Sequence, residues 1–351
     1  MTDTAYPLRT ERLLVRMLRE EDIDILTAYR NDPQVSALQD WDLPYPRERA
    51  AHLVAAHADR DDVLPGKGTQ LAIDLDGQLI GDIYVGLDEH AGIAEIGFSL
   101  AAEHHGKGYA VETASAVIDD LVDRLGVHRI VAELSPDNLA SARLLERLGM
   151  TFEYFAEKSF WWRGAWDDNL FYSMTGDERR AWRDRLLTPP DQVRLVELTH
   201  DNVWAYRRLR THRTQERFVA TMDQSFADAL FPEPEGGHPV VPVLRGIEAD
   251  GEPAGFLMWA DAINEGTPDP YLWRFLIDRA HQGRGIGRRA LDQWTEELRA
   301  AGHTAVEASW VQAPGGPEPF YLKAGFVLTG EMDDDEAVAR LELVDDDAAT
   351  P

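Results

Sequence analysis

The chain has 351 residues, of which 28% are charged, with a formal net charge of −28 at pH 7 and no cysteine. The lack of cysteine excludes disulfides, thiolate metal sites and a cysteine nucleophile, and the negative charge disfavours a general nucleic-acid binder because phosphates would be repelled. No apolar run approaches the roughly 18 residues of a membrane-spanning helix, and residues 1–7 lack a secretory leader pattern. We therefore expect a cytoplasmic protein with no nucleic-acid or membrane partner.

The first hundred residues predict a meander of strands with two helices. Apolar runs indicate the strands, acidic residues in the first turn indicate one helix start, and Asp76-Gly77 is a hairpin signal between two strands. In chain order the expected elements are a strand at 13–18, helices at 21–30 and 47–59, and strands at 71–75, 79–85 and 93–100.

A glycine-rich turn, His105-Gly-Lys-Gly-Tyr-Ala110, follows the strand that ends at Leu100. An amphipathic helix is expected from Tyr109 to Arg124. Glycines let the backbone turn sharply and approach a ligand closely, while the first amides of a helix and its dipole favour negative charge. The order of strand, glycine turn and helix therefore predicts a binding site for phosphates.

The remainder of the first half predicts a strand at 129–134, a short helix that ends in Leu144-Leu-Glu-Arg-Leu-Gly-Met150, and two aromatic strands between 154 and 174 that turn at Arg163-Gly164-Ala165. The aromatic side chains of this hairpin suit either the floor of an acceptor pocket or a packed hairpin, and both interpretations stay open. They are Trp161, Trp162, Trp166 and Phe171.

The linker between the two halves of the chain is expected at residues 186–192, where Pro189 and Pro190 cannot continue a helix. The length is enough for two domains, each with its own core. We expect domains at 1–185 and 193–344, followed by an acidic tail at 345–351.

The second half repeats this order. Its elements are a strand at 193–198, a helix from about 203, a long loop at 226–242, strands at 243–248 and 253–260 around Asp250-Gly251, a strand at 271–277, a helix at 286–301 and a strand at 305–311. A second turn, Gln282-Gly-Arg-Gly-Ile-Gly287, precedes the helix at 286–301, and Phe320-Tyr-Leu-Lys-Ala-Gly-Phe326 closes the unit. The two glycine-to-glycine distances, Gly108 to Gly149 and Gly285 to Gly325, are 41 and 40 residues.

This repetition decides between two phosphate ligands. A dinucleotide-binding fold also opens with Gly-x-Gly after a strand, but it places that turn after the first strand of a parallel sheet. Here several strands of a meander come first in each half. One architecture with the same order and spacing occurs twice, which favours a tandem repeat of a different fold.

The motif Gln/Arg-x-x-Gly-x-Gly/Ala, followed by a strand and a short helix that ends in Gly-aromatic, resembles the acyl-CoA-binding core of the GNAT superfamily of N-acetyltransferases. The first half also resembles, through the Asn138-x-x-Ser141 run, the branch that acetylates ribosomal-protein amino termini, while the second half resembles a generic GNAT domain. The resemblance implies an α/β (α+β) chain of two tandem GNAT folds. Each would be a mostly antiparallel, splayed mixed sheet with helices on both faces.

The resemblance further implies that acetyl-CoA is the acyl donor, that no metal is needed, and that acetyl passes directly to a primary amine in a ternary complex. The residues that would bind CoA are Phe98, Ser99, His105, Gly106, Lys107, Gly108, Tyr109, Ala110, Asn138 and Ser141 in the first half, and Leu276, Ile277, Gln282, Gly283, Arg284, Gly285, Ile286 and Gly287 in the second.

Three side chains are candidates for catalysis. Glu95 could accept the proton of the attacking ammonium, although a surface carboxylate explains it as well. Ser141 could donate to the departing thiolate, and so could Tyr321, whose alternative is a core tyrosine. Leu145 stands where other branches place the tyrosine, and Leu272 fills the place of Glu95 in the second half.

Two alternatives to this function remain. The chain could be a non-catalytic acyl-CoA-binding protein, or an enzyme in which one GNAT domain is a scaffold. His105 departs from the glutamine or arginine of the family, which should weaken CoA binding without abolishing it. The acceptor, a small-molecule or peptide amine, is not identified by the sequence, although the negative charge would attract a cationic one, and a homodimer remains open.

Overall fold

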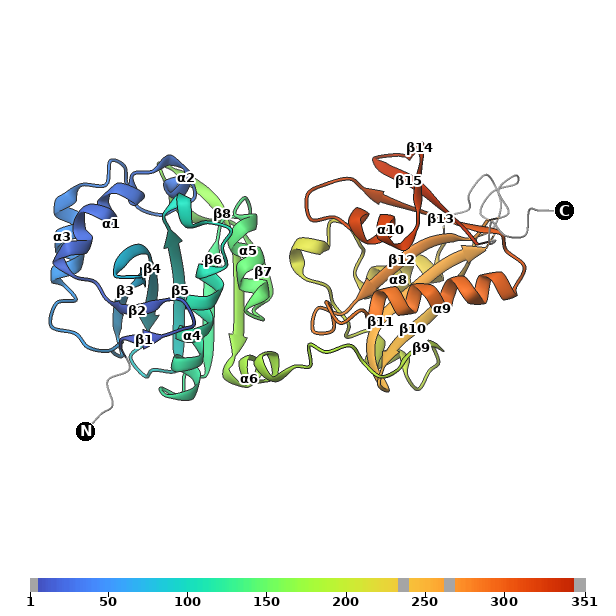
Figure 1. Cartoon of the computed structure of the whole chain (residues 1–351), viewed down its shortest axis with the longest axis horizontal. Coiled ribbons are helices and arrows are strands. Elements are labelled where there is room, and N and C mark those ends of the chain that lie inside the picture. Colours follow the sequence, from blue (N-terminus) through green and yellow to red (C-terminus); the bar gives the residue numbers. More distant parts are fainter. Residues whose placement is uncertain (1–5, 233–239, 262–268, 344–351) are drawn as a thin grey trace. The chain divides into compact units, whose positions relative to one another are not determined.

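The computed structural model describes residues 6–232, 240–261 and 269–343. The chain forms two compact units whose boundary falls between Asp184 and Arg185. Each unit is built on its own open sheet, with helices packed against it (Figure 1). The two units are described separately below. The predicted acidic tail at 345–351 lies outside the described residues.

The sheet of the first unit has eight strands in the order β1-β2-β3-β4-β5-β6-β8-β7. All neighbouring strands are antiparallel except β5 and β6, which are parallel. The strands are β1 (Leu8–Arg9), β2 (Leu14–Met17), β3 (Lys67–Leu75), β4 (Gln78–Leu87), β5 (Ile93–Leu100), β6 (Arg129–Leu134), β7 (Thr151–Trp162) and β8 (Ala165–Thr175).

Helices cover both faces of this sheet, because alternate residues of its strands are apolar on either side. One core joins α4 and α5 to residues such as Leu71 and Ile83, and another joins α1 and α3 to Ala72 and Leu79. The helices are η1 (Glu20–Asp22), α1 (Ile23–Arg30), α2 (Pro33–Ser36), α3 (Arg47–Ala55), η2 (Ala102–His104), α4 (Tyr109–Asp123), α5 (Leu139–Arg147) and α6 (Gly176–Asp184).

The second unit has a sheet of seven strands in the order β14-β15-β13-β12-β11-β10-β9. From the β9 edge inward, this order matches that of β2 to β8 in the first unit, with β12 and β13 as the parallel pair. The strands are β9 (Val193–Glu197), β10 (Val241–Ala249), β11 (Glu252–Asp261), β12 (Tyr271–Ile277), β13 (Ala305–Val311), β14 (Val327–Asp333) and β15 (Glu336–Glu342).

Helices also cover both faces of the second sheet. Leu257 packs with α9 on one face, while Phe256 and Met258 pack with α7 and α8 on the other. The helices are α7 (Val203–Tyr206), η3 (Arg213–Gln215), α8 (Met222–Leu230), α9 (Ile286–Ala300) and α10 (Glu318–Ala324). The predicted fold class of two splayed, mostly antiparallel sheets with helices is confirmed.

Both predicted hairpin turns are present. Asp76 and Gly77 have φ values of 53° and 87°, and Asp250 and Gly251 have 53° and 88°. Positive φ at both central residues is the turn that matches the twist of two paired strands. Aspartate and glycine tolerate these angles better than branched residues, which explains why the sequence signal was reliable.

Some predicted boundaries were wrong. The helix expected at 47–59 ends at Ala55, and α6 was not expected at all. The loop expected at 226–242 begins inside α8, whose Thr221 accepts a hydrogen bond from the amide of Gln224 as an N-cap. Part of that loop, 233–239, lies outside the described residues. Within the described residues no helix is long and apolar enough to span a membrane.

Candidate functional site

The two glycine turns adopt the same backbone conformation. Gly106 and Gly108 have φ values of 72° and 81°, and Gly283 and Gly285 have 78° and 75°. Gly108 and Gly285 are the left-handed N-caps of α4 and α9, two helices of 15 residues each. Positive φ is accessible to glycine at little cost, and the first amides of both helices have no intrahelical acceptor. Each turn can therefore present amides to an anion.

His105 and Gln282 make equivalent hydrogen bonds. The Nε2 of His105 donates to the carbonyl of Leu100 at 2.9 Å, and the Nε2 of Gln282 donates to the carbonyl of Ile277 at 3.0 Å. Both acceptors are the last residue of the strand before the turn. A ring nitrogen can donate where an amide does in other copies of the motif, so the departure at His105 preserves this link between strand and turn.

A cation at the first turn was not foreseen from the sequence. The guanidinium of Arg12 donates to the carbonyl of Lys107 at 3.0 Å and to Glu112 at 2.7 Å, and it lies 4.6 Å from the ring centre of Tyr109. Burial acts to raise the pKa of Glu112, but hydrogen bonds from Thr10 and Arg12 outweigh it and lower this pKa. Because Arg12 is about 100 residues from the turn, no local pattern pointed to it.

Arg284 of the second turn is 5% exposed, and its side chain faces the linker. Its Nε donates to the carbonyl of Thr188 at 2.9 Å, and its Nη1 lies 3.0 Å from Nδ1 of His281. Arg289 donates to the carbonyls of Pro190 and Asp191. These arginines hold residues 188–191 against the start of α9. Because the side chain of Arg284 is engaged in this contact, its backbone amide is the group that the turn can offer to an anion.

The parallel strands of each unit separate before they end. The pairing of β5 with β6 covers Ile93 to Glu95, although β5 continues to Leu100. The pairing of β12 with β13 covers Tyr271 and Leu272, although β12 continues to Ile277. In each unit the later strand residues thus leave a backbone edge that faces a gap. Phe98, Ser99, Leu276 and Ile277 lie on these edges.

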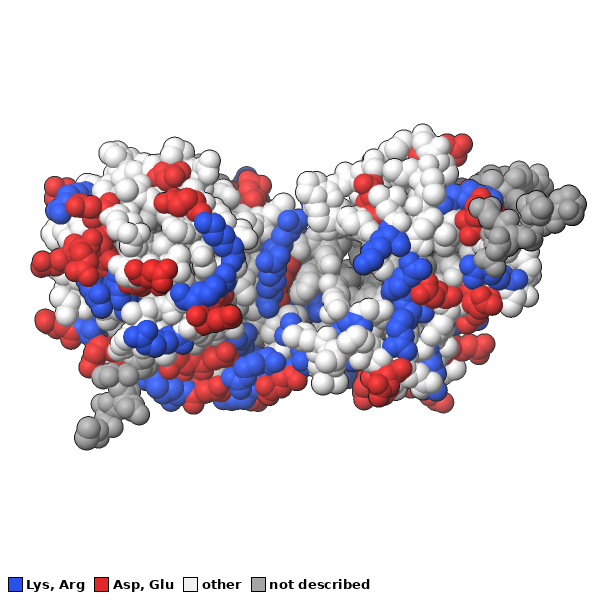
Figure 2. All heavy atoms as spheres, in the orientation of Figure 1, with Lys and Arg blue, Asp and Glu red and all other residues white. Residues whose placement is uncertain are grey.

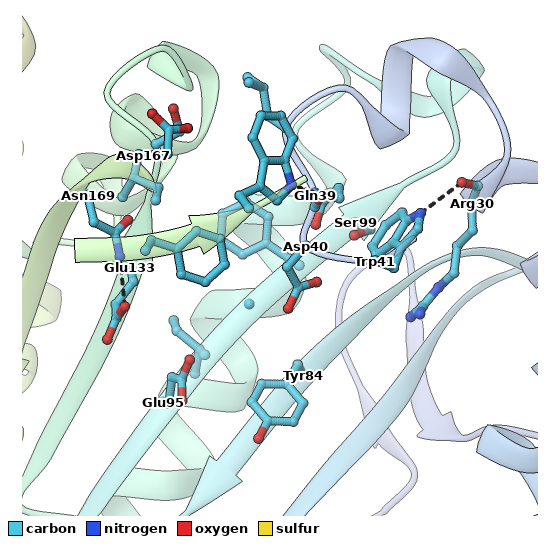
Figure 3. Close-up of a pocket in the computed structure, with 18 of the residues that line it drawn as sticks. Arg30, Gln39, Asp40, Trp41, Tyr84, Glu95, Ser99, Glu133, Asp167 and Asn169 are labelled. Carbon is cyan, nitrogen blue, oxygen red and sulfur yellow. Dashed lines mark hydrogen bonds between the residues drawn. The ribbon is translucent and has the colours of Figure 1, made fainter. Parts of the chain in front are cut away.

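A cavity of about 520 Å³ lies beside the splayed part of β5 in the first unit. Glu95, Phe98 and Ser99 line it, as do aromatic side chains from three other segments (Figure 3). Five carboxylates contribute to its wall: Asp40, Glu95, Glu133, Asp167 and Asp168. Among the described residues none of these five forms an ion pair with a basic side chain. The cavity is therefore suited to a cationic group.

The basic side chain in this wall, Arg30, is already neutralised. It donates to Asp82 at 2.5 Å, and its guanidinium lies 4.6 Å from the ring centre of Trp41 and 5.1 Å from that of Tyr45. Arg30 and Asp82 are 7% and 1% exposed. This buried pair fixes the aromatic end of the cavity without offsetting the five carboxylates.

Glu95 has the electrostatic setting of a general base. It remains solvent-exposed on β5 while lining the cavity. Partial burial, followed by repulsion from Glu133 and Asp40, raises its pKa above the ordinary value of 4.5. A carboxylate with a raised pKa accepts a proton more readily than an ordinary one.

The structure does not bring Asn138 and Ser141 into that cavity. Asn138 is the N-cap of α5, and its side-chain oxygen accepts a hydrogen bond from the amide of Ser141 at 3.1 Å. Ser141 is half-buried, and Leu145 is 2% exposed in the core. Both polar residues lie at the start of the helix that follows β6, beside the gap between the strands.

The aromatic hairpin of β7 and β8 divides its side chains between two roles. Phe160 and Trp162 line the first cavity, and the indole Nε1 of Trp162 donates to the carbonyl of Gln39 at 2.9 Å. Trp161 and Trp166 are each 58% exposed and pack edge to face on one another outside it. Both interpretations of the hairpin therefore apply, each to different residues.

The second unit contains a cavity of about 570 Å³ that brings most of its predicted site together. Leu276, Ile277, Gln282, Gly287 and Tyr321 line it. Tyr321 stacks on Trp310, with ring centres 4.8 Å apart and an angle of 9° between the planes. Burial, followed by the nearby Tyr271 and Glu336, raises its pKa well above the ordinary value of 10.

A β-bulge changes which residue of β12 holds the register position of Glu95. Opposite Trp259 on β11 stands Leu272, but opposite Met258 stands Arg274, so Trp273 is an extra residue. A bulge reverses the side on which the residues beyond it point. Leu272 is consequently 4% exposed in the core, and the prediction that it fills the place of Glu95 was wrong.

Tyr271 holds that register position instead, and it lines the cavity together with Leu272. Its hydroxyl lies 2.6 Å from Oγ of Ser309 on β13, and Ser309 donates a short hydrogen bond to Glu336 on β15. All three residues line the cavity with Tyr321. Asp269, which is near in sequence, instead forms an ion pair with Arg340. Within the described residues no group of three or more His, Cys, Asp or Glu could hold a metal ion.

Acidic and basic side chains also form ion pairs on the surface of the first unit. Figure 2 shows acidic and basic side chains interspersed on the visible face of the first unit. Arg124, for example, pairs with both Asp62 and Asp120, and Arg183 pairs with Asp123. Within the described residues, the five carboxylates of the first cavity form no such ion pairs.

Comparison with known proteins places both units in one group. Residues 12–151 match the family described as acetyltransferase (GNAT) domain, and residues 198–326 match that described as acetyltransferase (GNAT) family. The chain is 32% identical over 149 residues to the uncharacterized N-acetyltransferase p20 of Bacillus licheniformis, covering 42% of this chain and 83% of that protein.

Two further comparisons cover parts of the chain. The chain is 32% identical over 80 residues to the [ribosomal protein uS5]-alanine N-acetyltransferase of Escherichia coli, covering 23% of this chain and 41% of that enzyme. A solved structure of Mycobacterium smegmatis RimJ in complex with CoA-disulfide aligns with a TM-score of 0.44 at 21% identity, over 50% of this chain and 90% of that one.

Proposed function

The chain belongs to the GNAT acetyltransferase family, and from that premise we propose that it transfers acetyl from acetyl-CoA directly to a primary amine in a ternary complex. The observation that carries this proposal is the early end of parallel pairing in each unit, followed by a glycine turn. An open strand edge can pair with the amide-containing arm of CoA, while the turn amides bind its pyrophosphate.

In the first unit the amine would enter the acidic cavity. Glu95 would take a proton from the ammonium, directly or through water, so that the nitrogen lone pair attacks the thioester carbon. An amide on the open edge of β5 near Phe98 would stabilise the oxyanion that forms, an effect worth about 3 kcal/mol in comparable sites. Ser141 would donate a hydrogen bond to the CoA thiolate as the carbon–sulfur bond breaks.

In the second unit Tyr321 would protonate the thiolate. A phenol is protonated at neutral pH, as a proton donor requires. The stacked ring of Trp310 and the edge contacts of Phe320 and Phe326 hold the phenol in one orientation. This pre-organisation supports a role beyond core packing, because the same ring lines the cavity.

Calorimetry with acetyl-CoA and release of free thiol in the presence of an amine panel test the proposal. We expect two binding events per chain and turnover with at least one cationic amine. Tyr321→Phe should lower the activity of the second unit, and Ser141→Ala or Glu95→Gln that of the first.

The outcomes also separate the alternatives. Binding at two sites without turnover on any amine would favour an acyl-CoA-binding protein and contradict the proposed reaction. If substitutions in one unit abolish turnover and those in the other leave it unchanged, the unit that tolerates substitution has a scaffold role.

A further inference from the structure

We propose that Tyr271, Ser309 and Glu336 form a proton-accepting chain in the second unit, with Glu336 as the final acceptor of the proton that leaves the attacking amine. This inference rests on the proposed function. It supplies the second unit with the base that its sequence lacks at the position of Glu95.

The direction of the hydrogen bonds sets the direction of proton flow. Ser309 has one hydroxyl proton and donates it to the Glu336 carboxylate, so its Oγ must accept from the hydroxyl of Tyr271. Both O–H bonds consequently point towards Glu336. The oxygen of Tyr271 keeps a lone pair that can accept an N–H from a ligand in the cavity.

Tyr271 passes the proton on and does not keep it. Burial is the main cause that raises its pKa to about 12, so the phenol is protonated at neutral pH and cannot itself be the resting base. A carboxylate two hydrogen bonds away can take the charge instead. Networks of this kind are stronger than isolated bonds, because each bond polarises the next.

The three hydrogen-bonded side chains lie across three adjacent strands of the sheet. Tyr271 is on β12, Ser309 on β13 and Glu336 on β15, and Val311 is the register partner of Glu336 on β13. The bulge at Trp273 is what gives Tyr271, rather than Leu272, the register position that Glu95 holds in the first unit. The position of Tyr271 in this proton path thus depends on one inserted residue in an otherwise repeated strand.

Proton donor and proton acceptor meet in the same cavity. Tyr271 and Glu336 lie close enough to Tyr321 to contribute to the rise of its pKa, and all of them line the space next to Gln282 and Gly287. As the carbon–nitrogen bond forms, the amine proton passes to Tyr271, the Tyr271 proton to Ser309 and the Ser309 proton to Glu336. The carbon–sulfur bond then breaks, and Tyr321 gives its proton to the thiolate.

The test uses the full chain with Glu95→Gln, so that thiol release reports the second unit. On this background Glu336→Gln, which keeps the shape and a hydrogen-bond acceptor, should lower kcat about 100-fold, while the affinity for acetyl-CoA measured by calorimetry stays unchanged. Glu342→Gln, a substitution on the same strand, is the matched control and should leave kcat unchanged. Glu336→Asp should recover part of the loss.

Non-additive losses of kcat distinguish a hydrogen-bonded relay from separate structural roles of its residues. Ser309→Ala should lower kcat as Glu336→Gln does, and the double variant should be no slower than the slower single variant, because both break one path. The inference is overturned if Glu336→Gln behaves like its control, if the two losses multiply, or if the Glu95→Gln chain is inactive while the native chain is active. Inactivity of the native chain on every amine would instead overturn the proposed function, and this inference with it.

Discussion

At the scale of single residues, the two halves solve the same local problem with different side chains. His105 and Gln282 each tie the glycine turn to the last carbonyl of the preceding strand. The fixed requirement is one N–H at that point, which an imidazole and a carboxamide can both supply. Substitution at this position is therefore a weak sign of lost function.

The acid side of the pH profile should report Glu95. A base with a raised pKa loses its activity at higher pH than an ordinary carboxylate, since it is protonated as pH falls through that raised value. Glu133→Gln removes one source of the repulsion that raises the pKa of Glu95, so the lower break in kcat/KM against pH should move to lower pH. The profile is measured on a chain with Tyr321→Phe, and an unmoved break would contradict this role.

Substitution of the turn glycines should weaken CoA binding, whereas substitution of glycines with the same conformation elsewhere should not. Alanine at Gly108 or Gly285 costs about 1–2 kcal/mol in the left-handed region and places a methyl group where the backbone must approach a phosphate. Gly126 and Gly302 have φ values of 69° and 95° with open space around them, so alanine there costs similar stability.

Only the two turn variants should weaken CoA binding, each by about tenfold or more at one of two sites. Calorimetry measures the affinities, and thermal unfolding verifies that the paired variants lose similar stability. Equal affinities in all four variants would argue against pyrophosphate binding at the turns.

Sequence reasoning found the residues whose signal is local. Glu95, Phe98 and Tyr321 line cavities, and each lies within or beside a recognisable motif. Arg12 and Glu336 had no such signal, because Arg12 contacts the turn and α4 from about 100 residues away, and Glu336 reaches its site through pairing of β15 with β13. Long-range contacts of that kind have no local pattern in one sequence.

At the scale of elements, strands were predicted better than the faces they present. Ile93–Leu100, Arg129–Leu134, Tyr271–Ile277 and Ala305–Val311 match their predicted bounds. Apolar runs bounded by polar turns mark these strands well. The bulge in β12 had no compositional sign, since one additional residue changes register without changing the kind of residue.

The bulge makes a testable difference between two leucines. Leu272→Glu should not create a base. Instead it should destabilise the second unit by about 3 kcal/mol or more, because the carboxylate would be buried without a partner. Leu328→Glu on β14, where the native side chain is 40% exposed, should have little effect. Urea unfolding measures both, and a stable Leu272→Glu variant with increased activity would refute the assignment of faces.

At the scale of the whole molecule, the duplicated architecture was visible in the sequence because glycine spacing survives where side chains differ. The shared strand order of the two sheets confirms two like folds. The carboxylate cluster of the first cavity was not predicted beyond Glu95. Its members come from one loop and three strands, and their convergence depends on the tertiary fold.

The attachment of residues 188–191 to Arg284 and Arg289 has a consequence for proteolysis. Leu186 and Leu187 precede that attachment, are each 64% exposed and lie outside helices and strands, unlike the more exposed Leu230 of α8, so a brief digestion with a protease that cuts after leucine should cleave there first. The products should be two fragments near the boundary at Asp184 and Arg185, identified by mass spectrometry. Early cuts inside either sheet would contradict this expectation. Arg289→Ala should extend the cleavable stretch towards Asp191. The cleavage pattern would then measure how firmly residues 188–191 are held.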